Sequence, residues 1–418
     1  MSCIVKKENK NLEGSILLPA SKSISNRVLL IRALCKEKFE IKNLSESADS
    51  QLLNELLFKI SSHSSFTKPL ILDCKDAGTV ARFLTTYVAL LKKGHYIITG
   101  NERMQQRPMN DLIESLIAIG ANVSCLKNDG FLPLMIQPTH DLKSIVYLNC
   151  SKSSQFLSSF LLVAPLLPNG LTINHNNNMV SKPYIDMTIS LMAFFGVEVL
   201  IKNNCFIVPP QSYTPDNIAI EADWSAVAFW YQMAAYSENV NLKIIGLNSN
   251  SIQGDSILVD IYKQFGVITH FEPNGVLLTK EKHPIDYFEY DFINTPDIFP
   301  SVALTCAFLN IPSKLTGIVN LKDKESDRIL AIVNELKKIG IGTIINSENN
   351  CLSFIGNEVS SFPENIVLRT YQDHRIAMAF ASCAAFTGRI CIDDSKVVSK
   401  SYPDFWKHIK EMGFVINK

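Results

Sequence analysis

A weak internal repeat constrains the fold of this 418-residue chain more than any other feature of its sequence. In each copy, a pattern typical of a helix ends in an apolar residue and a glycine. A segment of alternating apolar and polar residues, a polar turn and a second such segment then follow. The glycines are Gly120, Gly196, Gly266, Gly340 and Gly413, spaced by 76, 70, 74 and 73 residues. The last copy is truncated, and the stretch before residue 73 lacks the glycine.

Each copy of the repeat predicts a helix followed by a β-hairpin. Glycine tolerates the positive φ at which many helices end, and alternation with a period of two is typical of a half-buried strand. Turns such as Asn128-Asp129-Gly130 and Pro273-Asn274-Gly275 predict the reversal between the two strands. One such glycine would mean little, but regular recurrence predicts an α/β protein with two similar halves built from βαβ-plus-hairpin units.

Length and composition exclude several classes of protein. A chain of this length favours two domains of about 200 residues. Lys plus Arg and Asp plus Glu each number 40, and this zero net charge disfavours nucleic acid or an anionic membrane as the main partner. The ten cysteines form no C-x-x-C pair, so we expect no zinc or redox motif. Without an apolar N-terminal region or a long apolar window, the sequence predicts a cytoplasmic protein.

Hydroxyl-rich or basic motifs stand at five predicted helix starts in the first half of the chain. Free N–H groups and the helix dipole favour anions at such places. The motifs are SKSISNR from Ser21, DAGTVAR from Asp76, RMQQRPM from Arg103, SKSSQF from Ser151 and SKPY from Ser181. The first should follow a strand at 14–18 and open a helix from residue 28 onward. Each alone could be an ordinary N-cap, whereas five together favour an anionic ligand.

The second half of the chain supplies acidic residues next to further basic ones. The motifs are TPD ending at Asp297, NLKDKESDR from Asn320, YQDHR from Tyr371 and KSYPD from Lys400. On a helix, Lys324 and Arg328 would share one face and repel each other unless an anion lay between them. The alternative is a solvated run of charges. No second histidine lies at ligand spacing from His374, so we expect no metal there.

Nine of these motifs, in this order from Lys22 to Lys400, resemble the 5-enolpyruvylshikimate-3-phosphate (EPSP) synthases. The resemblance implies a two-domain enolpyruvyl transferase fold, with three repeated βαβαββ units about a pseudo-threefold axis in each domain. It places the active site in the cleft between the domains. One domain would be discontinuous (1–20 and 222–418) and carry the acidic side of the site. The inserted domain (21–221) would carry the shikimate 3-phosphate side.

The resemblance also implies the reaction. The enolpyruvyl group of phosphoenolpyruvate would move to the 5-hydroxyl of shikimate 3-phosphate by addition and elimination through a tetrahedral intermediate, releasing phosphate. This step belongs to the shikimate pathway towards chorismate and the aromatic amino acids. It needs no cofactor or metal. The partners would be these two small molecules, with no nucleic acid and no membrane, and the chain is expected to be a monomer.

The site residues follow by resemblance from the matching motif positions. Shikimate 3-phosphate would be bound by Lys22, Ser23, Arg27, Ser153, Ser154, Gln155, Ser181, Tyr184, Asp297, Asn320 and Lys324. Phosphoenolpyruvate would be bound by Lys22, Gly78, Arg107, Gln155, Arg328, Arg375 and Lys400. The catalytic groups would be Asp297, Glu325, Lys22 and His374. Among these, Asp297 would serve the hydroxyl, Glu325 the methylene carbon and Lys22 the departing phosphate.

Two positions depart from the family pattern, and three rival interpretations stay open. Asp76 stands where the family commonly has Asn, and Phe83 where many members have Pro, which leaves the response to the family inhibitor glyphosate undecided.

A UDP-N-acetylglucosamine enolpyruvyl transferase would typically carry a cysteine in the region 103–107, and none is present. An RNA 3′-phosphate cyclase is disfavoured by the zero net charge. A non-catalytic module is disfavoured because every site residue is present.

Overall fold

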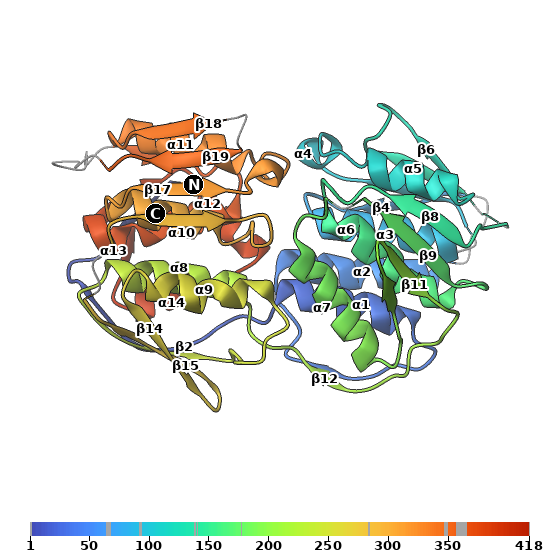
Figure 1. Ribbon diagram of the computed structural model, residues 1–418, viewed down its shortest axis with the longest axis horizontal. Helices are drawn as coiled ribbons and strands as arrows, with labels where there is room; N and C mark the ends of the chain where they lie inside the picture. Colours follow the sequence, from blue (N-terminus) through green and yellow to red (C-terminus); the bar gives the residue numbers. More distant parts are fainter. Residues whose placement is uncertain are drawn as a thin grey trace. The chain divides into compact units, whose positions relative to one another are not determined.

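The computed structural model describes residues 2–63, 68–91, 94–137, 139, 141–176, 178–282, 285–346, 350–356 and 366–417. The chain divides into two compact units. Unit 1 comprises Met1–Ser21 and Glu221–Lys418, and unit 2 comprises Lys22–Ile220. Each unit combines helices with several small sheets (Figure 1). Unit 1 is therefore discontinuous, because the chain leaves it after Ser21 and returns at Glu221.

Three four-stranded sheets are formed by the described residues of unit 1. The first has the order β2 (Asn11–Leu17), β13 (Asn239–Ile245), β15 (Gly275–Lys280) and β14 (Val267–Glu272). The second has the order β16 (Phe288–Asp291), β17 (Ser313–Thr316), β19 (Cys351–Phe354) and β18 (Thr343–Asn346). The third has the order β20 (Val367–Leu368), β21 (Arg389–Ile392), β1 (Cys3–Lys6) and β22 (Val415–Asn417).

In the part of unit 2 that the structure describes, there are two four-stranded sheets and one smaller sheet. The first has the order β4 (Leu70–Asp73), β5 (Tyr96–Thr99), β7 (Leu134–Gln137) and β6 (Asn122–Cys125). The second has the order β8 (Ile145–Leu148), β9 (Leu171–His175), β11 (Cys205–Val208) and β10 (Leu200–Lys202). Within the described residues the third sheet has two parallel strands, β3 (Ile41–Lys42) and β12 (Ile218–Ala219).

The five four-stranded sheets share one topology, which confirms the repeated units predicted from the glycine spacing. The first two strands of each sheet run parallel, and the remaining neighbours pair antiparallel. The five repeat glycines adopt φ values between 79° and 101°. The truncated last copy supplies β22 alone, and β1 from the beginning of the chain pairs with it in register Val5↔Ile416.

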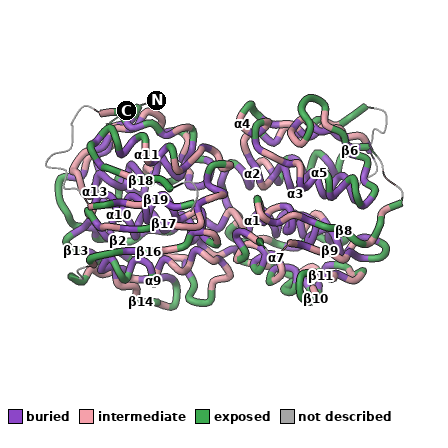
Figure 2. Tube along the Cα trace, turned by 45° about the horizontal axis from the view of Figure 1, so that its top comes forward, coloured by how far each residue is buried: buried purple, intermediate pink, exposed green. Residues whose placement is uncertain are grey.

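Helices contribute much of the buried part of each unit (Figure 2). Those of unit 2 are α1 (Lys22–Leu34), α2 (Ala48–Ser62), α3 (Gly78–Leu91), α4 (Glu102–Gln105), α5 (Asn110–Ala118), α6 (Ser154–Val163) and α7 (Lys182–Phe194). Those of unit 1 are α8 (Trp224–Tyr236), α9 (Leu258–Lys263), α10 (Phe299–Phe308), α11 (Arg328–Lys338), α12 (His374–Ser382), α13 (Ala384–Thr387) and α14 (Phe405–Glu411). Every residue of α8, α10 and α12 is buried, and these three pack together. A helix that is apolar on all sides requires such a position.

One predicted helix boundary and one expected helical face were wrong, and both affect the site. The first helix begins at Lys22, so that Arg27 lies on it and not before it. Helix α11 begins only at Arg328, with Asp327 as its N-cap. Lys324 therefore does not share a helical face with Arg328, because a capping aspartate starts the helix later than the charge pattern suggested.

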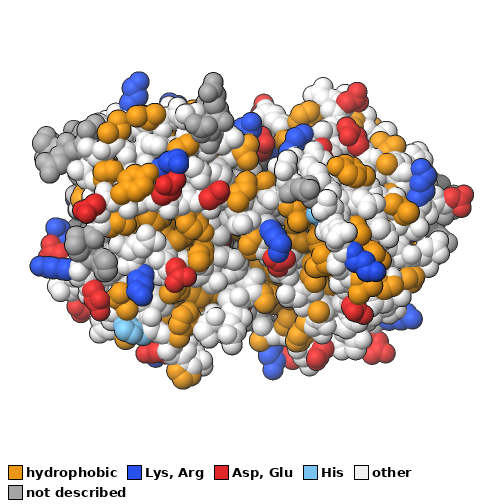
Figure 3. Space-filling view, viewed as in Figure 1, with side chains coloured by type: hydrophobic (Ala, Val, Ile, Leu, Met, Phe, Trp, Pro, Cys, Tyr) orange, Lys and Arg blue, Asp and Glu red, His pale blue; other side chains and the backbone are white. Residues whose placement is uncertain are grey.

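No helix in the described part of the chain is long and apolar enough to cross a membrane. All ten cysteines are free thiols. Among the described residues, no three His, Cys, Asp or Glu side chains gather in a group that could hold a metal ion. On the face drawn in Figure 3, basic and acidic side chains are interspersed, and neither sign of charge gathers in one area.

Candidate active site

The N-terminal turns of α1, α6 and α7 meet around Arg27 in unit 2. The Arg27 Nε donates to Thr188 Oγ1 of α7 at 2.7 Å, and Nη2 donates to the carbonyl oxygen of Tyr184 at 3.0 Å. Nη2 also donates to Ser158 Oγ of α6 at 3.3 Å. Because these residues belong to the first two turns of their helices, three positive ends of helix dipoles converge here. Such a place favours a bound anion.

Helix α3 joins the same cluster through Gln155 of α6. The Gln155 side chain accepts a hydrogen bond from Arg82 Nη1 at 2.7 Å and donates one to Thr79 Oγ1 at 3.0 Å. The start of α3 is tightly packed, since a Cβ added at Gly78 would lie 2.5 Å from Arg107 Nη1 and 2.6 Å from Arg82 Nη1. Glycine at position 78 thus lets two guanidinium groups approach the backbone of a helix N-terminus.

Arg27 is a buried cation whose hydrogen-bond partners are neutral. It is 2% exposed, and among the described residues it donates to two hydroxyls and two backbone carbonyls but to no carboxylate. Burial lowers the pKa of its guanidinium to about 10. Its guanidinium carbon lies 5.6 Å from the ring centre of Phe83 and 6.0 Å from that of Tyr184. An anion bound here would compensate the positive charge of Arg27, whose hydrogen-bond partners within the chain are all neutral.

The hydroxyl-rich helix starts combine capping with conformational strain. Ser153 is the N-cap of α6, and its Oγ accepts from the backbone N–H of Gln155 at 3.3 Å. Ser181 is the N-cap of α7 and adopts φ 55° and ψ 42°, a left-handed conformation that costs a non-glycine residue about 1 kcal/mol or more. Residues held in this region concentrate at ligand-binding sites. At the start of α1, Lys22 Nζ lies 3.3 Å from Asp49 Oδ2.

The remaining predicted residues of unit 2 lie at neighbouring helix starts. Ser23 and Ser154 occupy the first turns of α1 and α6. Arg107 lies between α4 and α5 and is 6% exposed. Asp76 is partly buried in the turn from β4 to α3. Phe83 is fully buried beside Arg27, which is a neighbour that sequence reasoning missed.

Unit 1 places carboxylates where unit 2 has hydroxyls and cations. Asp223, Asp327 and Asp373 are the N-caps of α8, α11 and α12, and each accepts backbone N–H hydrogen bonds. Asp297 lies two residues before α10. Aspartate at a helix start satisfies free N–H groups and is stabilised by the helix dipole. The acids expected from the sequence therefore have a structural reason for their positions in addition to any chemical role.

Arg328 is the centre of the acidic cluster. Its Nη1 donates to Asp297 Oδ1 at 3.0 Å, its Nη2 to Glu325 Oε2 at 3.0 Å and its Nε to Asp373 Oδ2 at 2.9 Å. Arg328 is 1% exposed. Burial by itself would lower the pKa of this guanidinium, but the charges of the three carboxylates outweigh burial and raise that pKa. Arg328 thus binds three negative groups of its own chain at once.

Asp297 also receives a hydrogen bond from Arg375. The distance from Arg375 Nη2 to Asp297 Oδ2 is 2.9 Å, and the Asp297 side chain is 19% exposed. Burial would raise the pKa of the Asp297 carboxyl, but the charges of Arg375, Lys324 and Arg328 together lower it well below its ordinary value. Asp297 is therefore an anion in the chain as it stands.

The loop before α12 positions Asp373 and His374. Tyr371 and Gln372 adopt φ values of 53° and 56°, and the Tyr371 hydroxyl donates to Glu335 Oε1 at 2.7 Å. These two left-handed residues turn the chain so that Asp373 caps α12. His374 is 1% exposed, and its Nδ1 lies 3.9 Å from Asp373 Oδ1. The sequence pattern named His374 but passed over Asp373, although Asp373 stands in the same DHR motif.

The structure thus divides the predicted residues between the two units. Those in unit 2 are Lys22, Ser23, Arg27, Gly78, Arg107, Ser153, Ser154, Gln155, Ser181 and Tyr184. Those in unit 1 are Asp297, Asn320, Lys324, Glu325, Arg328, His374, Arg375 and Lys400. Asn320 is buried in a short 3-10 helix (Val319–Leu321), and Lys400 Nζ lies 4.0 Å from Glu325 Oε1.

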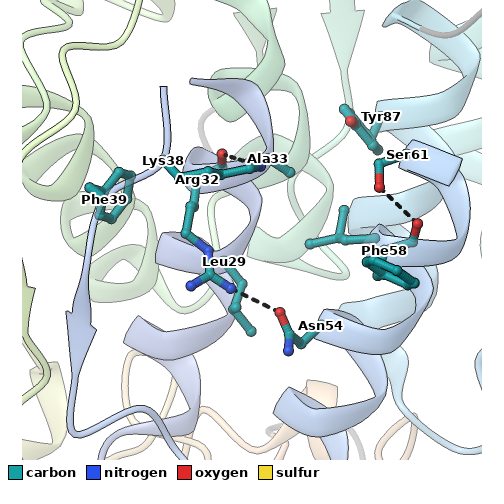
Figure 4. Close-up of a pocket in the computed structure, with 10 residues that line it drawn as sticks. Leu29, Arg32, Ala33, Lys38, Phe39, Asn54, Phe58, Ser61 and Tyr87 are labelled. Carbon is teal, nitrogen blue, oxygen red and sulfur yellow. Dashed lines mark hydrogen bonds between the residues drawn. The ribbon is translucent and has the colours of Figure 1, made fainter. Parts of the chain in front are cut away.

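A separate cavity of about 390 Å³ lies in unit 2 between α1, α2 and the middle of α3 (Figure 4). Its lining residues are Leu29, Arg32, Ala33, Lys38, Phe39, Asn54, Leu57, Phe58, Ser61 and Tyr87. Arg32 Nη2 donates to Asn54 Oδ1 at 2.9 Å across its wall. No predicted site residue lines this cavity, so its position gives no support to the predicted chemistry.

Comparison with known proteins shows which family this chain resembles. The family model described as EPSP synthase (3-phosphoshikimate 1-carboxyvinyltransferase) matches residues 6–409. A 3-phosphoshikimate 1-carboxyvinyltransferase of Bacteroides fragilis is 39% identical, with 97% of this chain and 96% of that protein covered. One from Methanospirillum hungatei is 33% identical, with 94% of each chain covered.

Solved structures with the same fold are similar over the whole chain. An EPSP synthase of Acinetobacter baumannii aligns with a TM-score of 0.78 at 21% identity and covers 100% of both chains. The enolpyruvyl transferase NikO of Streptomyces tendae aligns with a TM-score of 0.75 at 14% identity, covering 100% of this chain and 98% of that one. At such identities the likeness concerns the fold alone, whereas the family model and the curated relatives extend over the motifs as well. The chain therefore belongs to the EPSP synthase family.

Proposed function

We propose that the chain transfers the enolpyruvyl group of phosphoenolpyruvate to the 5-hydroxyl of shikimate 3-phosphate and releases phosphate. The observation that carries this proposal is the match of the family model to residues 6–409. The relatives named 3-phosphoshikimate 1-carboxyvinyltransferase support the same activity, which belongs to the shikimate pathway. The proposal also assigns anion binding to the basic residues of unit 2 and proton transfer to the carboxylates of unit 1. The role of each residue is part of the same proposal.

The basic cluster of unit 2 suits anionic substrates. Each substrate carries a carboxylate and a phosphate, and a phosphate monoester approaches a charge of −2 near neutral pH. Arg27 would bind the carboxylate of shikimate 3-phosphate together with Ser23, because its present partners are all neutral. Ser153, Ser154 and Ser181 would donate hydroxyl hydrogen bonds to its phosphate at two helix starts.

The other binding roles follow the same logic. Gln155, Tyr184, Asn320 and Lys324 would complete the site of shikimate 3-phosphate. Arginine pairs bidentately with carboxylate and phosphate. Phosphoenolpyruvate would accordingly be bound by Arg107, Arg328 and Arg375, by Lys22 and Lys400, and by the backbone of Gly78.

The carboxylates of unit 1 would move the protons. In the addition step, the 5-hydroxyl oxygen bonds to C2 of phosphoenolpyruvate and its proton passes to Asp297. C3 gains a proton from Glu325, which would have taken up that proton when substrate anions drew Arg328 away from it. In the elimination step, C3 returns a proton to Glu325 and the C2–O bond to phosphate breaks. Lys22 would stabilise the departing phosphate, and His374 would lie beside these groups. Asp297 would pass the hydroxyl proton to the departing phosphate, and the product keeps the enol double bond, so atoms and charge balance.

Substrate binding would itself prepare Asp297 as a base. In the chain without substrate, Arg375 and Arg328 hydrogen bond to Asp297 and depress the pKa of its carboxyl. Anionic groups of phosphoenolpyruvate would compete for both guanidinium groups. The pKa of Asp297 would then rise towards a value suited to proton transfer. In this way Asp297 could be paired with Arg375 and Arg328 in the chain without substrate and still act as a base during catalysis.

The partners, oligomeric state and cellular compartment of the enzyme are part of the same proposal. The family acts on small-molecule substrates. We expect the chain to act as a monomer in the cytoplasm, without nucleic acid, membrane, metal or cofactor. The interspersed charges on the face in Figure 3 and the zero net charge support the absence of a large anionic partner.

Phosphate release is the decisive measurement. Purified protein should release phosphate from phosphoenolpyruvate only when shikimate 3-phosphate is also present, and added chelator should not change the rate. Release with UDP-N-acetylglucosamine in place of shikimate 3-phosphate would overturn the substrate assignment and favour the sister transferase.

A further inference from the structure

Asp255 is a buried carboxyl group for which the proposed mechanism has no use. It lies in a short 3-10 helix, η2 (Gly254–Ile257), and is 4% exposed. Its Oδ2 accepts a short hydrogen bond of 2.5 Å from Ser225 Oγ in the first turn of α8. Its Oδ1 has no hydrogen-bond partner among the residues that the structure describes. A buried ionised carboxylate normally has more partners than this.

The charged and titratable groups around Asp255 come from four elements. Asp297 precedes α10, Arg375 belongs to α12, Asp223 caps α8, and Tyr290 belongs to β16. Asp297 and Asp223 oppose a negative charge on Asp255, whereas Arg375 favours one. The hydrogen bond of Arg375 Nη2, however, goes to Asp297. Asp255 thus shares its nearby cation with a second carboxyl group.

These surroundings favour the neutral form of Asp255. Burial raises the pKa of its carboxyl most, and the charge of Asp297 raises it further. The hydrogen bond from Ser225 and the charge of Arg375 act in the opposite direction, and the resulting pKa is about 7. Two neighbouring carboxyls that cannot both ionise readily hold one proton between them over a range of pH.

We propose that Asp255 is a positioning residue that carries a proton in the working enzyme and so reserves the charge of Arg375 for Asp297 and the anionic substrate. This inference rests on the proposed function, in which Arg375 binds phosphoenolpyruvate. A proton on Asp255 leaves a single negative charge beside the Arg375 guanidinium. Loss of that proton adds a second negative charge, which repels the substrate anion and competes for the same guanidinium. Protonation of Asp255 therefore controls affinity for phosphoenolpyruvate.

Infrared spectroscopy of the ligand-free protein tests the proton directly. Wild-type protein should show a carbonyl stretching band of a protonated carboxyl that disappears with a midpoint near pH 7. Asp255→Asn should lack this band, and Asp260→Asn, which removes an exposed aspartate five residues away, should keep it. Ser225→Ala should move the midpoint to higher pH, because the Ser225 hydroxyl stabilises the charged form.

Steady-state kinetics test the consequence for the substrate. The KM for phosphoenolpyruvate should rise between pH 6 and pH 8 about fivefold more in the wild type than in Asp255→Asn. Comparing the two proteins at each pH removes the titration of the substrate phosphate, whose own pKa is about 6. Asp260→Asn should follow the wild type, and kcat should respond less than KM in all three proteins.

The outcomes separate this inference from the proposed function. A band that is absent from the wild type at pH 6, or unchanged in Asp255→Asn, would show that Asp255 is ionised and would overturn the inference. Parallel KM profiles of wild type and Asp255→Asn would do the same. Failure of the wild type to release phosphate would instead refute the proposed function, and the infrared result on ligand-free protein would stand regardless.

Discussion

The two units differ in the side chains that lie at their helix N-termini. In unit 2 the starts of α1, α6 and α7 carry serine or lysine, and Arg27 has neutral partners. In unit 1 the starts of α8, α11 and α12 carry a capping aspartate, and Arg328 binds three carboxylates. Both arginines are buried, with exposed fractions of 2% and 1%. Burial dominates at Arg27 and lowers its pKa, whereas neighbouring charges dominate at Arg328 and raise its pKa.

This contrast indicates different tasks for similar architecture. A helix N-terminus carries free N–H groups and a partial positive charge. Either a capping aspartate of the chain or a bound anion can satisfy them. Unit 1 follows the first course and gathers carboxylates around Arg328. Unit 2 follows the second course, and its Arg27 has neutral partners. In the proposed function, the same repeated units would supply acids in one half and anion sites in the other.

The largest expected effect is the loss of stability when Arg328 is removed. Arg328→Met leaves Asp297, Glu325 and Asp373 without their shared cation, and breaking a buried ion pair in this way costs about 3–5 kcal/mol. Urea denaturation should show this loss. Arg369→Met removes an exposed arginine of the same unit and should change stability by about 0.5 kcal/mol or less. If Arg27→Met destabilises the protein as much as Arg328→Met, the contrast between the two units fails.

A second prediction uses the pH dependence of stability to probe the carboxyls of unit 1. Asp255 has an ordinary pKa of 3.8 when unfolded and about 7 when folded. Between these values the folded chain keeps a proton that the unfolded chain has lost, so this contribution is complete below pH 4 and disappears as the pH rises to 7. Asp255→Asn has no such titration. Its stability relative to wild type should increase by about 2–3 kcal/mol between pH 5 and pH 7.

Urea denaturation at several pH values measures that difference. Asp260→Asn should show an offset from wild type that does not change with pH. A constant offset for Asp255→Asn as well would mean that Asp255 titrates normally, and the acidic cluster would then differ from the basic one only in composition.

A third prediction concerns the uncompensated cation of unit 2. Arg27→Met should weaken binding of shikimate 3-phosphate about 30-fold, or about 2 kcal/mol, because one partner of a buried charged pair is lost. Isothermal titration calorimetry measures the change. The matched control is Arg32→Met, which removes an arginine from the same helix that is bonded to Asn54 in the separate cavity. Equal affinity in Arg27→Met and wild type would show that Arg27 is only a structural arginine.

The smallest expected effect comes from Gly78. In Gly78→Ala the new methyl group would displace the guanidinium groups of Arg107 and Arg82 from the start of α3. The KM for phosphoenolpyruvate should rise about fivefold, since an added methyl in a packed site costs about 1 kcal/mol or more. Inhibition by glyphosate, which is longer than phosphoenolpyruvate, should weaken more than substrate use.

Gly94→Ala serves as the control for this substitution, because a Cβ there would also be tightly packed, but its nearest atoms belong to the Tyr96 side chain (Oη at 3.1 Å) and not to an arginine. Unchanged kinetics and unchanged inhibition in Gly78→Ala would place Gly78 away from the phosphoenolpyruvate site. The basic cluster would then contain fewer groups than the comparison of the two units assumes.

The sequence by itself determined the local elements of this protein and the residue types at its helix starts. Positive φ at the five repeat glycines and the hairpin turns are properties of a few adjacent residues, so the periodic pattern was sufficient to predict them. The helix start at Lys22 was placed too late. The helical face expected for Lys324 and Arg328 does not form, because Asp327 caps the helix after Lys324.

Only the tertiary structure decided how distant residues combine. The chain supplies β1 to complete the sheet of β22, and Arg328 collects carboxylates from positions 31 and 45 residues away. The burial of Asp255 beside Asp297 and the contact of Phe83 with Arg27 likewise join separate segments. Local sequence patterns act over a few residues, whereas burial and electrostatic interactions depend on which segments the folded chain brings together.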